Sequence, residues 1–563
     1  MILDHINDIA AICAAQGVKT AIISPGSRSA PLTLAFVRHP DIETRVIPDE
    51  RAAAFIGMGM AQQQKRPVVL VCTSGSAAYN YAPAVAEAFF QQIPLLVLTA
   101  DRPPEWIDQY DGQTIRQKGI YGQHVKASFD FPDNPNHPDI AWHGNRIVNE
   151  ALIASMNEPL GPVHINVPLR EPFYPEVDER TFFRKVRTIT KSTAAKMPST
   201  ETWAALLKTW NQSDKKLVVA GQQTADSQLA NSLSSLSRKT GAVVVSDIIS
   251  NQHEVEGIIS HQDAFLHPSL ADKNQVLQPD LLITFGKSNI SKNLKLFLRK
   301  HPATVHWHIQ PHERYQDTFQ SLTQLIEAEA PYFFQALESQ TGSANDEYQK
   351  QWQAANEKVA HLNNHFFQDQ SFGEFQAVQS ILSHLPEHSQ LQLANSMAVR
   401  YANFLGLKDK KGITVWCNRG TSGIDGSNST AVGAALSQDQ MVTLITGDMA
   451  FFYDRNAFWH NYPTPNLRVI VLNNQAGGIF RLIKGPSDQP ELEEYFETRQ
   501  QLNAKSLAAE FGFGYSQATD AASLAESLKS FYSASEQAKI LEIHTDSATN
   551  AAIFKAYWSF IFS

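Results

Sequence analysis

The chain has 563 residues, of which 43% are hydrophobic and 18% are charged, the composition of a globular protein that is too long for one core. Its net charge of −9 excludes the broad basic surface that nucleic-acid binding requires, and the short basic run 184–187 is interpreted as a solvated linker segment. The three cysteines, Cys13, Cys72 and Cys417, are scattered. They fit neither a metal site nor an even set of disulfides, so we expect a reducing, cytoplasmic environment.

The N-terminal residues and the hydropathy pattern give no sign of export or membrane insertion. The first eight residues carry acids where a signal peptide has a basic segment, so no such peptide is expected. No apolar run approaches 18 residues, so the sequence predicts no membrane span.

Strand and helix signals alternate over roughly the first 175 residues. The strand candidates are 20–23, 68–71 and 95–98, and segments with helical spacing cover 52–63 and 83–90. This alternation is typical of a parallel sheet with helices on both faces.

A further strand candidate lies between 20–23 and 68–71 and ends near Val46, and an acidic pair follows it. Asp49 and Glu50 stand where a helix is predicted to begin. Asp49 can cap that helix and Glu50 can stabilise its positive end. Spacing alone does not distinguish this structural role from a catalytic one.

Several segments rich in arginine and amide side chains follow predicted strands. They are 24–32, 99–105 and 112–117 in the first unit, and 395–400 and 418–419 near the C-terminal end. Guanidinium groups bind carboxylates in a bidentate manner, so arginines gathered near one site favour a substrate with several carboxylates. The alternative is that they form structural ion pairs with Asp49, Asp101 or Asp425. The arginines concerned are Arg28, Arg102, Arg116, Arg400 and Arg419.

A second α/β unit follows a charged, Thr/Ser-containing stretch at 176–200 that we interpret as a linker. Its strand candidates are 217–221, 242–247 and 281–286. The polar segment 338–370 is predicted to be helical and to lead into a third unit.

The third unit contains a glycine-dense loop, 418–426, before a helix of small residues at 430–435. Glycines let a backbone approach a ligand closely. Ile424 is unusual in such a loop; it can be a buried anchor of the loop, and that role does not exclude a contact with a ligand.

Two apolar strands of this unit end in metal-binding residue types. The run 442–446 ends at Gly447-Asp448, and 467–472 ends at Asn473-Asn474. Strands joined by one helix are parallel and deliver these side chains to the same carboxyl edge. One carboxylate, one amide oxygen and phosphate oxygens suit Mg²⁺. The alternative is that Asp448 caps a helix and Asn473-Asn474 forms an ordinary turn.

This last stretch resembles the thiamine-diphosphate (ThDP) motif, which begins Gly-Asp and ends Asn-Asn. The resemblance implies Mg²⁺ or Mn²⁺ bound by Asp448, Asn474 and the backbone carbonyl of Ala476. It also implies that Glu50 activates the aminopyrimidine ring and that Ile424 keeps the cofactor bent. The sequence departs from the motif at Met449, where glycine is common, and at Ala450, where a hydroxyl residue is usual. The implied cofactor-binding residues are Gly423, Ile424, Gly447, Asp448, Met449, Ala450, Asn474 and Ala476.

The order of these segments resembles the 2-succinyl-5-enolpyruvyl-6-hydroxy-3-cyclohexene-1-carboxylate (SEPHCHC) synthases of menaquinone biosynthesis. The likeness covers the first and third units, and in the middle unit only Ser291-Lys292. It implies decarboxylation of 2-oxoglutarate and 1,4-addition to isochorismate, in a homodimer or homotetramer whose sites lie between two chains. The implied substrate-binding residues are Ser27, Arg28, Arg102, Gln113, Lys292, Ser396, Arg400, Arg419 and Phe480.

The resulting fold prediction is α/β, with three successive doubly wound parallel-sheet domains at 1–178, 195–340 and 365–563. Two other functions stay open. One is a ThDP carboligase or decarboxylase of the acetolactate-synthase type, which often carries FAD in the middle unit. The other is a ThDP-fold binding subunit without activity, but such a chain should have lost Glu50 or Asp448.

Overall fold

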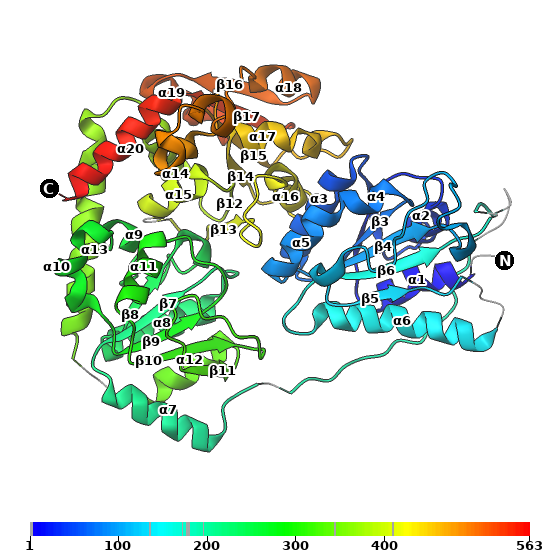
Figure 1. Ribbon diagram of the computed structural model, residues 1–563, viewed down its shortest axis with the longest axis horizontal. Helices are drawn as coiled ribbons and strands as arrows, with labels where there is room; N and C mark the ends of the chain where they lie inside the picture. Colours follow the sequence, from blue (N-terminus) through cyan, green and yellow to red (C-terminus); the bar gives the residue numbers. More distant parts are fainter. Residues whose placement is uncertain are drawn as a thin grey trace.

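The computed structural model describes residues 4–133, 137–171, 173–175, 181–194, 196–342, 345–407 and 410–562, apart from the side chains of 271 and 272. Three sheets follow one another along the chain, and each forms the centre of its own α/β layer structure (Figure 1). All the paired strands run parallel. The predicted fold class is therefore confirmed, while the domain boundaries stay predictions.

The first sheet has the strand order β2-β1-β3-β4-β6-β5. Its strands are short and buried except at the β2 and β5 edges. Its strands are β1 Thr20–Ile23, β2 Glu43–Val46, β3 Val68–Cys72, β4 Leu95–Asp101, β5 Ser128–Asp130 and β6 Val163–Pro168, and its helices are α1 Asp4–Ala15, α2 Ala30–Val37, α3 Glu50–Gln64, α4 Ser76–Asn80, α5 Ala82–Gln91 and α6 Pro138–Met156.

The middle sheet has the order β11-β10-β9-β7-β8. The helix predicted over 338–370 corresponds to the end of α12 and to α13, and positions 343 and 344 lie outside the described residues. Its strands are β7 Lys216–Ala220, β8 Val243–Ser246, β9 Leu281–Phe285, β10 Val305–Gln310 and β11 Gln324–Glu327, and its α-helices are α7 Thr200–Gln212, α8 Ser227–Thr240, α9 Gln262–Phe265, α10 Ala271–Asn274, α11 Lys292–Lys300, α12 Ala330–Gln340 and α13 Glu347–Phe366.

The third sheet, β13-β12-β14-β15-β17-β16, repeats the strand order of the first when strands are counted from each domain's start. The two outer domains are thus built on one plan. Its strands are β12 Gln390–Leu393, β13 Thr414–Cys417, β14 Val442–Gly447, β15 Leu467–Asn473, β16 Gly514–Ala518 and β17 Lys539–His544, and its α-helices are α14 Glu374–His384, α15 Met397–Leu405, α16 Ser427–Ala435, α17 Asp448–Tyr453, α18 Ala504–Glu510, α19 Ala521–Phe531 and α20 Ser547–Phe562.

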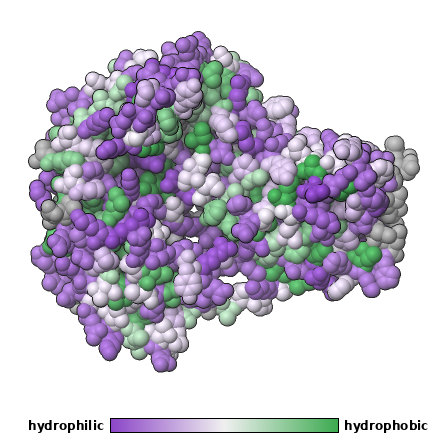
Figure 2. Space-filling model, viewed as in Figure 1, coloured by the Kyte–Doolittle hydropathy of each residue, from purple (hydrophilic) through white to green (hydrophobic). Residues whose placement is uncertain are grey.

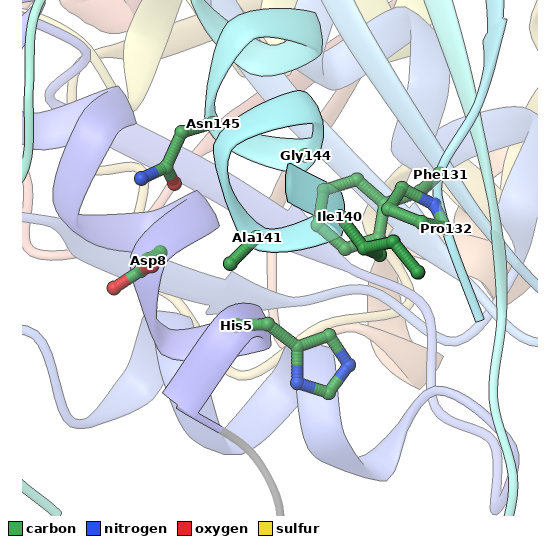
Figure 3. A pocket seen from close by; sticks show the side chains of 8 residues that line it. All are labelled: His5, Asp8, Phe131, Pro132, Ile140, Ala141, Gly144 and Asn145. Carbon is green, nitrogen blue, oxygen red and sulfur yellow. The ribbon is translucent and has the colours of Figure 1, made fainter. Parts of the chain in front are cut away.

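The segment 181–194 of the predicted linker is not simply solvated. Arg184 Nε donates to Asp8 Oδ1 at 2.8 Å, and Ile189 N donates to Asn149 Oδ1 at 2.7 Å. Both partners belong to the first domain, on α1 and α6. The gap beside Asp8, between these two helices (Figure 3), has a volume of only about 10 Å³. It is therefore a packing defect with room for one water at most.

The three domains surround a cleft of about 800 Å³, which is lined by α5, the carboxyl ends of β9 and β10, and the Arg419-Gly420 loop. Figure 2 shows the surface hollowed where the first domain meets the other two. Within the described part of the chain, no helix is both long and apolar enough to cross a membrane.

The first and third domains are joined where α3 crosses α16 (Figure 1). A Cβ on Gly59 would lie 2.2 Å from the backbone oxygen of Thr430, and one on Gly433 would lie 2.1 Å from the oxygen of Ile56. The backbones are in direct contact, so neither helix can make room by moving a side chain. Glycine is required at both positions.

Gly433→Ala should therefore destabilise the junction by about 1–3 kcal/mol, the usual range for overpacking. A thermal unfolding experiment should show a lowered melting temperature. The control is Gly342→Ala, where an added Cβ meets nothing within 4 Å. Equal melting temperatures for the two variants would contradict the rigid crossing.

A buried carboxylate fastens α17 to α16 inside the third domain. Asp454 accepts hydrogen bonds from Ser429 N and Ser429 Oγ, both at 2.7 Å. Burial raises the pKa of Asp454 to about 7, against the opposing effects of those bonds and of Arg51. The native state therefore binds this proton up to a higher pH than the unfolded chain does.

Between about pH 4 and 7 the native state holds more protons at Asp454 than the unfolded state, so stability falls as pH rises through this window. Asp454→Asn removes that dependence. The melting temperature of the original chain, relative to the variant, should be higher at pH 5 than at pH 7.5. A difference that stays constant or grows with pH would contradict this assignment.

Candidate cofactor and substrate site

The predicted metal-binding stretch forms the expected parallel βαβ unit. β14 pairs with β15 in parallel, with Gly447 opposite Leu472. Asp448 is the first residue of α17, and Asn474 directly follows β15. The carboxylate and the amide therefore come from neighbouring strands at one edge of the sheet.

Asp448 is 2% exposed, and no lysine or arginine pairs with it in the described part of the chain. Its Oδ2 accepts from Gln500 Nε2 at 2.7 Å, and the backbone amides of Met449 and Ala476 also donate to the carboxylate. Burial nevertheless raises the pKa of Asp448 to about 6. A buried carboxylate without a cationic partner fits a bound metal ion.

The second predicted ligand, Asn474, is held on both sides of its amide. Its Oδ1 accepts from Ala476 N at 3.0 Å, and its Nδ2 donates to Glu374 Oε1 at 2.7 Å. The described residues contain no cluster of three or more His, Cys, Asp or Glu that could hold a metal. A cation here would therefore depend on the single carboxylate of Asp448, on amide and carbonyl oxygens and on ligand phosphates, which suits Mg²⁺.

Glu50 begins α3 and is half-buried. The predicted cap is Asp49, which accepts from Ala52 N at 3.0 Å and from Asn456 Nδ2 at 2.7 Å. The carboxylate of Glu50 makes one long contact, from Asn80 Nδ2 at 3.5 Å. Capping is therefore done by Asp49, and Glu50 keeps hydrogen-bonding capacity for a ligand.

The glycine-dense loop is held by hydrogen bonds to Glu87, a buried acid that the sequence did not indicate. Glu87 accepts from Gly420 N at 2.7 Å and from Thr421 N at 2.6 Å. Asn395 Nδ2 donates to Gly423 O at 2.7 Å. Ile424 is 37% exposed, so it is not a buried anchor in this chain and its side chain is available to a ligand.

Met449 is partly exposed beside the ligand edge and Ala450 is 3% exposed. The alanine therefore faces the interior, and no hydroxyl is presented from this position. Gly447 is open, because a Cβ there would meet nothing within 4 Å.

Two arginines of the third domain bind the adjacent residues Ser396 and Asn395, and neither has an acidic hydrogen-bonding partner among the described residues. Arg400 Nη1 donates to Ser396 O at 2.6 Å, and Arg419 Nη1 donates to Asn395 Oδ1 at 3.0 Å. Burial and then the charge of Arg419 lower the pKa of Arg400. Arg419 Nε is buried without an acceptor. An anionic ligand would relieve both conditions.

The arginines of the first domain are held differently. Arg28 is 6% exposed, donates to Leu169 O at 3.0 Å and lies over the Phe173 ring at 4.5 Å. Arg102 pairs with Asp111 at 3.2 Å. Arg116 pairs with Asp108 at 2.9 Å. Within the described residues, none of the five arginines forms an ion pair with Asp49, Asp101 or Asp425, so the structural alternative is wrong as stated.

The remaining predicted residues lie at the open ends of their elements. Ser27 and Gln113 are exposed on loops of the first domain, and Lys292 is exposed at the start of α11. Phe480 is partly buried, with its ring centroid 5.9 Å from that of Phe496. The predicted metal-binding residues and the Arg400–Arg419 pair thus lie in the domain of the third sheet. The predicted substrate-binding residues Ser27, Arg28, Arg102 and Gln113 lie in the domain of the first sheet.

Comparison with known proteins agrees with this geometry. Residues 5–120 match the family model "Thiamine pyrophosphate enzyme, N-terminal TPP binding domain", residues 182–393 match "Middle domain of thiamine pyrophosphate", and residues 396–543 match "Thiamine pyrophosphate enzyme, C-terminal TPP binding domain". Thiamine pyrophosphate is another name for ThDP. The predicted cofactor class is therefore confirmed.

Among curated proteins, the SEPHCHC synthase of Cytophaga hutchinsonii is 45% identical over 555 residues, which cover 99% of this chain and 98% of that protein. The synthase of Flavobacterium psychrophilum is 40% identical and covers 97% of both chains. That of Porphyromonas gingivalis is 37% identical and covers 97% of this chain and 95% of its own. The chain therefore belongs to the ThDP-dependent enzymes and, among them, to the SEPHCHC synthase family.

Proposed function

We propose that this chain joins 2-oxoglutarate to isochorismate with loss of CO₂, giving SEPHCHC. The observation that carries the proposal is the Arg400–Arg419 pair, whose guanidinium groups bind the adjacent residues Ser396 and Asn395, while the buried Nε of Arg419 has no acceptor among the described residues. Such a pair favours a carboxylate-rich substrate, because a fixed fork of donors binds carboxylates in a bidentate manner. Both proposed substrates carry more than one carboxylate.

The proposed substrate-binding set extends this cationic surface. Ser396 and Arg400 come from one helix of the third domain, α15, and its N-cap. Arg28, Arg102 and Lys292 come from the first and middle domains. We assign the carboxylates and hydroxyl groups of the two substrates to this set and an apolar wall to Phe480. The complete set is Ser27, Arg28, Arg102, Gln113, Lys292, Ser396, Arg400, Arg419 and Phe480.

Bound ThDP supplies the electron sink for the carbon–carbon bond cleavage that releases CO₂. Glu50 is assigned to hydrogen-bond the aminopyrimidine ring and hold a proton there. Asp448, Asn474 and the carbonyl of Ala476 would hold a Mg²⁺ or Mn²⁺ ion that binds the diphosphate. Gly423 and Ile424 would contact the cofactor, and the Ile424 side chain would keep it bent.

We also infer a homodimer at least, with a tetramer as the alternative, in which each site lies between two chains. The exposed side chain of Ile424 and the weakly engaged Glu50 support this inference. Glu50 belongs to the first domain and Ile424 to the third, and a second copy would supply the partner half of each site.

The test is CO₂ release from 2-oxoglutarate with ThDP and Mg²⁺, with and without isochorismate. We expect rapid release and a carboligated product only when isochorismate is present. Release that ignores isochorismate would instead favour a decarboxylase. Glu50→Gln should still bind ThDP but lose at least about 10²–10⁴-fold in turnover, the usual contribution of a general acid–base group.

Arg102 is engaged by Asp111 in this structure, and a substrate carboxylate would have to replace that acid. A partly exposed pair of this kind is worth up to about 1 kcal/mol. Asp111→Asn should therefore lower the KM for the substrate bound at Arg102 by up to about fivefold. Steady-state kinetics with each substrate varied would measure this.

Asp108→Asn is the matched control, because it removes the same charge from the same loop but releases Arg116 instead. It should leave both KM values unchanged. An equal fall in KM for the two variants would indicate a general charge effect rather than competition at Arg102.

A further inference from the structure

The amide of Asn474 can bind a cation through its oxygen only if it is turned the right way. The oxygen and nitrogen ends of an asparagine side chain have nearly the same shape, so neighbouring donors and acceptors decide the orientation. Ala476 N–H donates to Oδ1 at 3.0 Å from one side. Glu374 Oε1 accepts from Nδ2 at 2.7 Å from the other.

Glu374 lies 100 residues before Asn474 in the chain, so this contact is not local. It is the first residue of α14 and is 3% exposed. Its carboxyl group also forms a hydrogen bond with Tyr401. Glu374 therefore brings a hydrogen-bond acceptor to Asn474 from outside the βαβ unit, and Tyr401 helps to hold that acceptor.

The backbone around Glu374 is also fixed. Glu374 N donates to Asn550 Oδ1 at 3.0 Å. A Cβ on Gly373 would lie 2.9 Å from that same oxygen and 2.6 Å from Ile553 Cδ1. The start of α14 is therefore clamped against α20, and Glu374 cannot move away from Asn474 without breaking these contacts.

The opposite orientation of the Asn474 amide would be unfavourable on both sides. If the amide turned over, Nδ2 would face the Ala476 N–H, two donors would meet, and Oδ1 would face the Glu374 carboxyl. The observed orientation satisfies every one of these groups.

We propose that Glu374 is a positioning residue for cofactor loading: it accepts the Asn474 Nδ2 hydrogen bond and thereby keeps Oδ1 turned toward the cation site. The inference rests on the proposed role of Asn474 as a metal ligand. Partners that orient a metal ligand typically change metal affinity by about 10–100-fold when removed.

The test measures ThDP binding to the apo chain as Mg²⁺ is increased, followed by tryptophan fluorescence or calorimetry, so that no turnover is needed. Glu374→Met fills the space without an acceptor and should raise the Mg²⁺ concentration for half-maximal ThDP binding by about 10–100-fold. Glu374→Gln keeps an amide oxygen that can accept from Nδ2, so it should stay within about threefold of the original chain.

Asp520→Ala is the matched control. It removes a carboxylate from the start of another helix of the same domain, α19, where Asp520 caps the helix through Ser523 N at 2.8 Å. It should lower the melting temperature of the apo chain but leave the Mg²⁺ dependence unchanged. Glu374→Ala makes the same comparison if methionine prevents folding.

An unchanged Mg²⁺ dependence in Glu374→Met or Glu374→Ala would overturn the role of Glu374 but leave the proposed function intact. A glutamine variant as weak as the methionine variant would overturn it too, because the hydrogen-bond acceptor would then not be the feature that matters. If the original chain bound ThDP without any need for Mg²⁺, the cation site itself would be wrong, and the inference would fail with it.

Discussion

The crossing of α3 and α16 is the contact on which the rest of the site depends. Gly59 and Gly433 remove the side chains that would separate the two backbones. α3 begins at Glu50, and α16 begins directly after the loop that carries Ile424. Because the backbones touch, the starts of both helices are set relative to each other without any adjustable side chain between them. In the proposed dimer these two helix starts belong to different sites, so the crossing fixes the spacing of the two half-sites that one chain contributes.

The repeated sheet order extends this constraint. The first and third sheets have the same strand order, so each domain presents its loops at the carboxyl edge of a parallel sheet. In one chain these two edges are separate groups of residues. In the proposed dimer, a second copy would pair a first-domain edge with a third-domain edge. The middle domain contributes the Lys292 loop, held by the buried Asp247 through Ser291 N at 3.0 Å.

The sequence predicted what is local in the chain. The strand runs at 20–23 and 442–446, and the placement of Asp448 directly after a strand, follow from hydrophobic patterning and turn chemistry over a few residues. It could not predict Glu374 or Gln500, which reach the metal edge from 100 and 52 residues away. A lone glutamate at a helix start and a glutamine in a loop carry no pattern. Short edge strands such as β5 were missed because three residues give too little periodicity.

The same edge of the third sheet carries buried groups of opposite charge. Around the proposed cation, the protein supplies carboxylates, and burial together with Asp448 raises the pKa of Glu374 to about 8. Elsewhere on this edge it supplies guanidinium groups, and burial and then the charge of Arg419 lower the pKa of Arg400. The buried carboxylates and the buried guanidinium groups are each unfavourable without a partner of opposite charge. A diphosphate with its metal ion would relieve the first, and substrate carboxylates would relieve the second. The buried carboxylates of this edge therefore favour a cation and the buried guanidinium groups favour an anion, which agrees with separate places for the proposed cofactor and the proposed substrates.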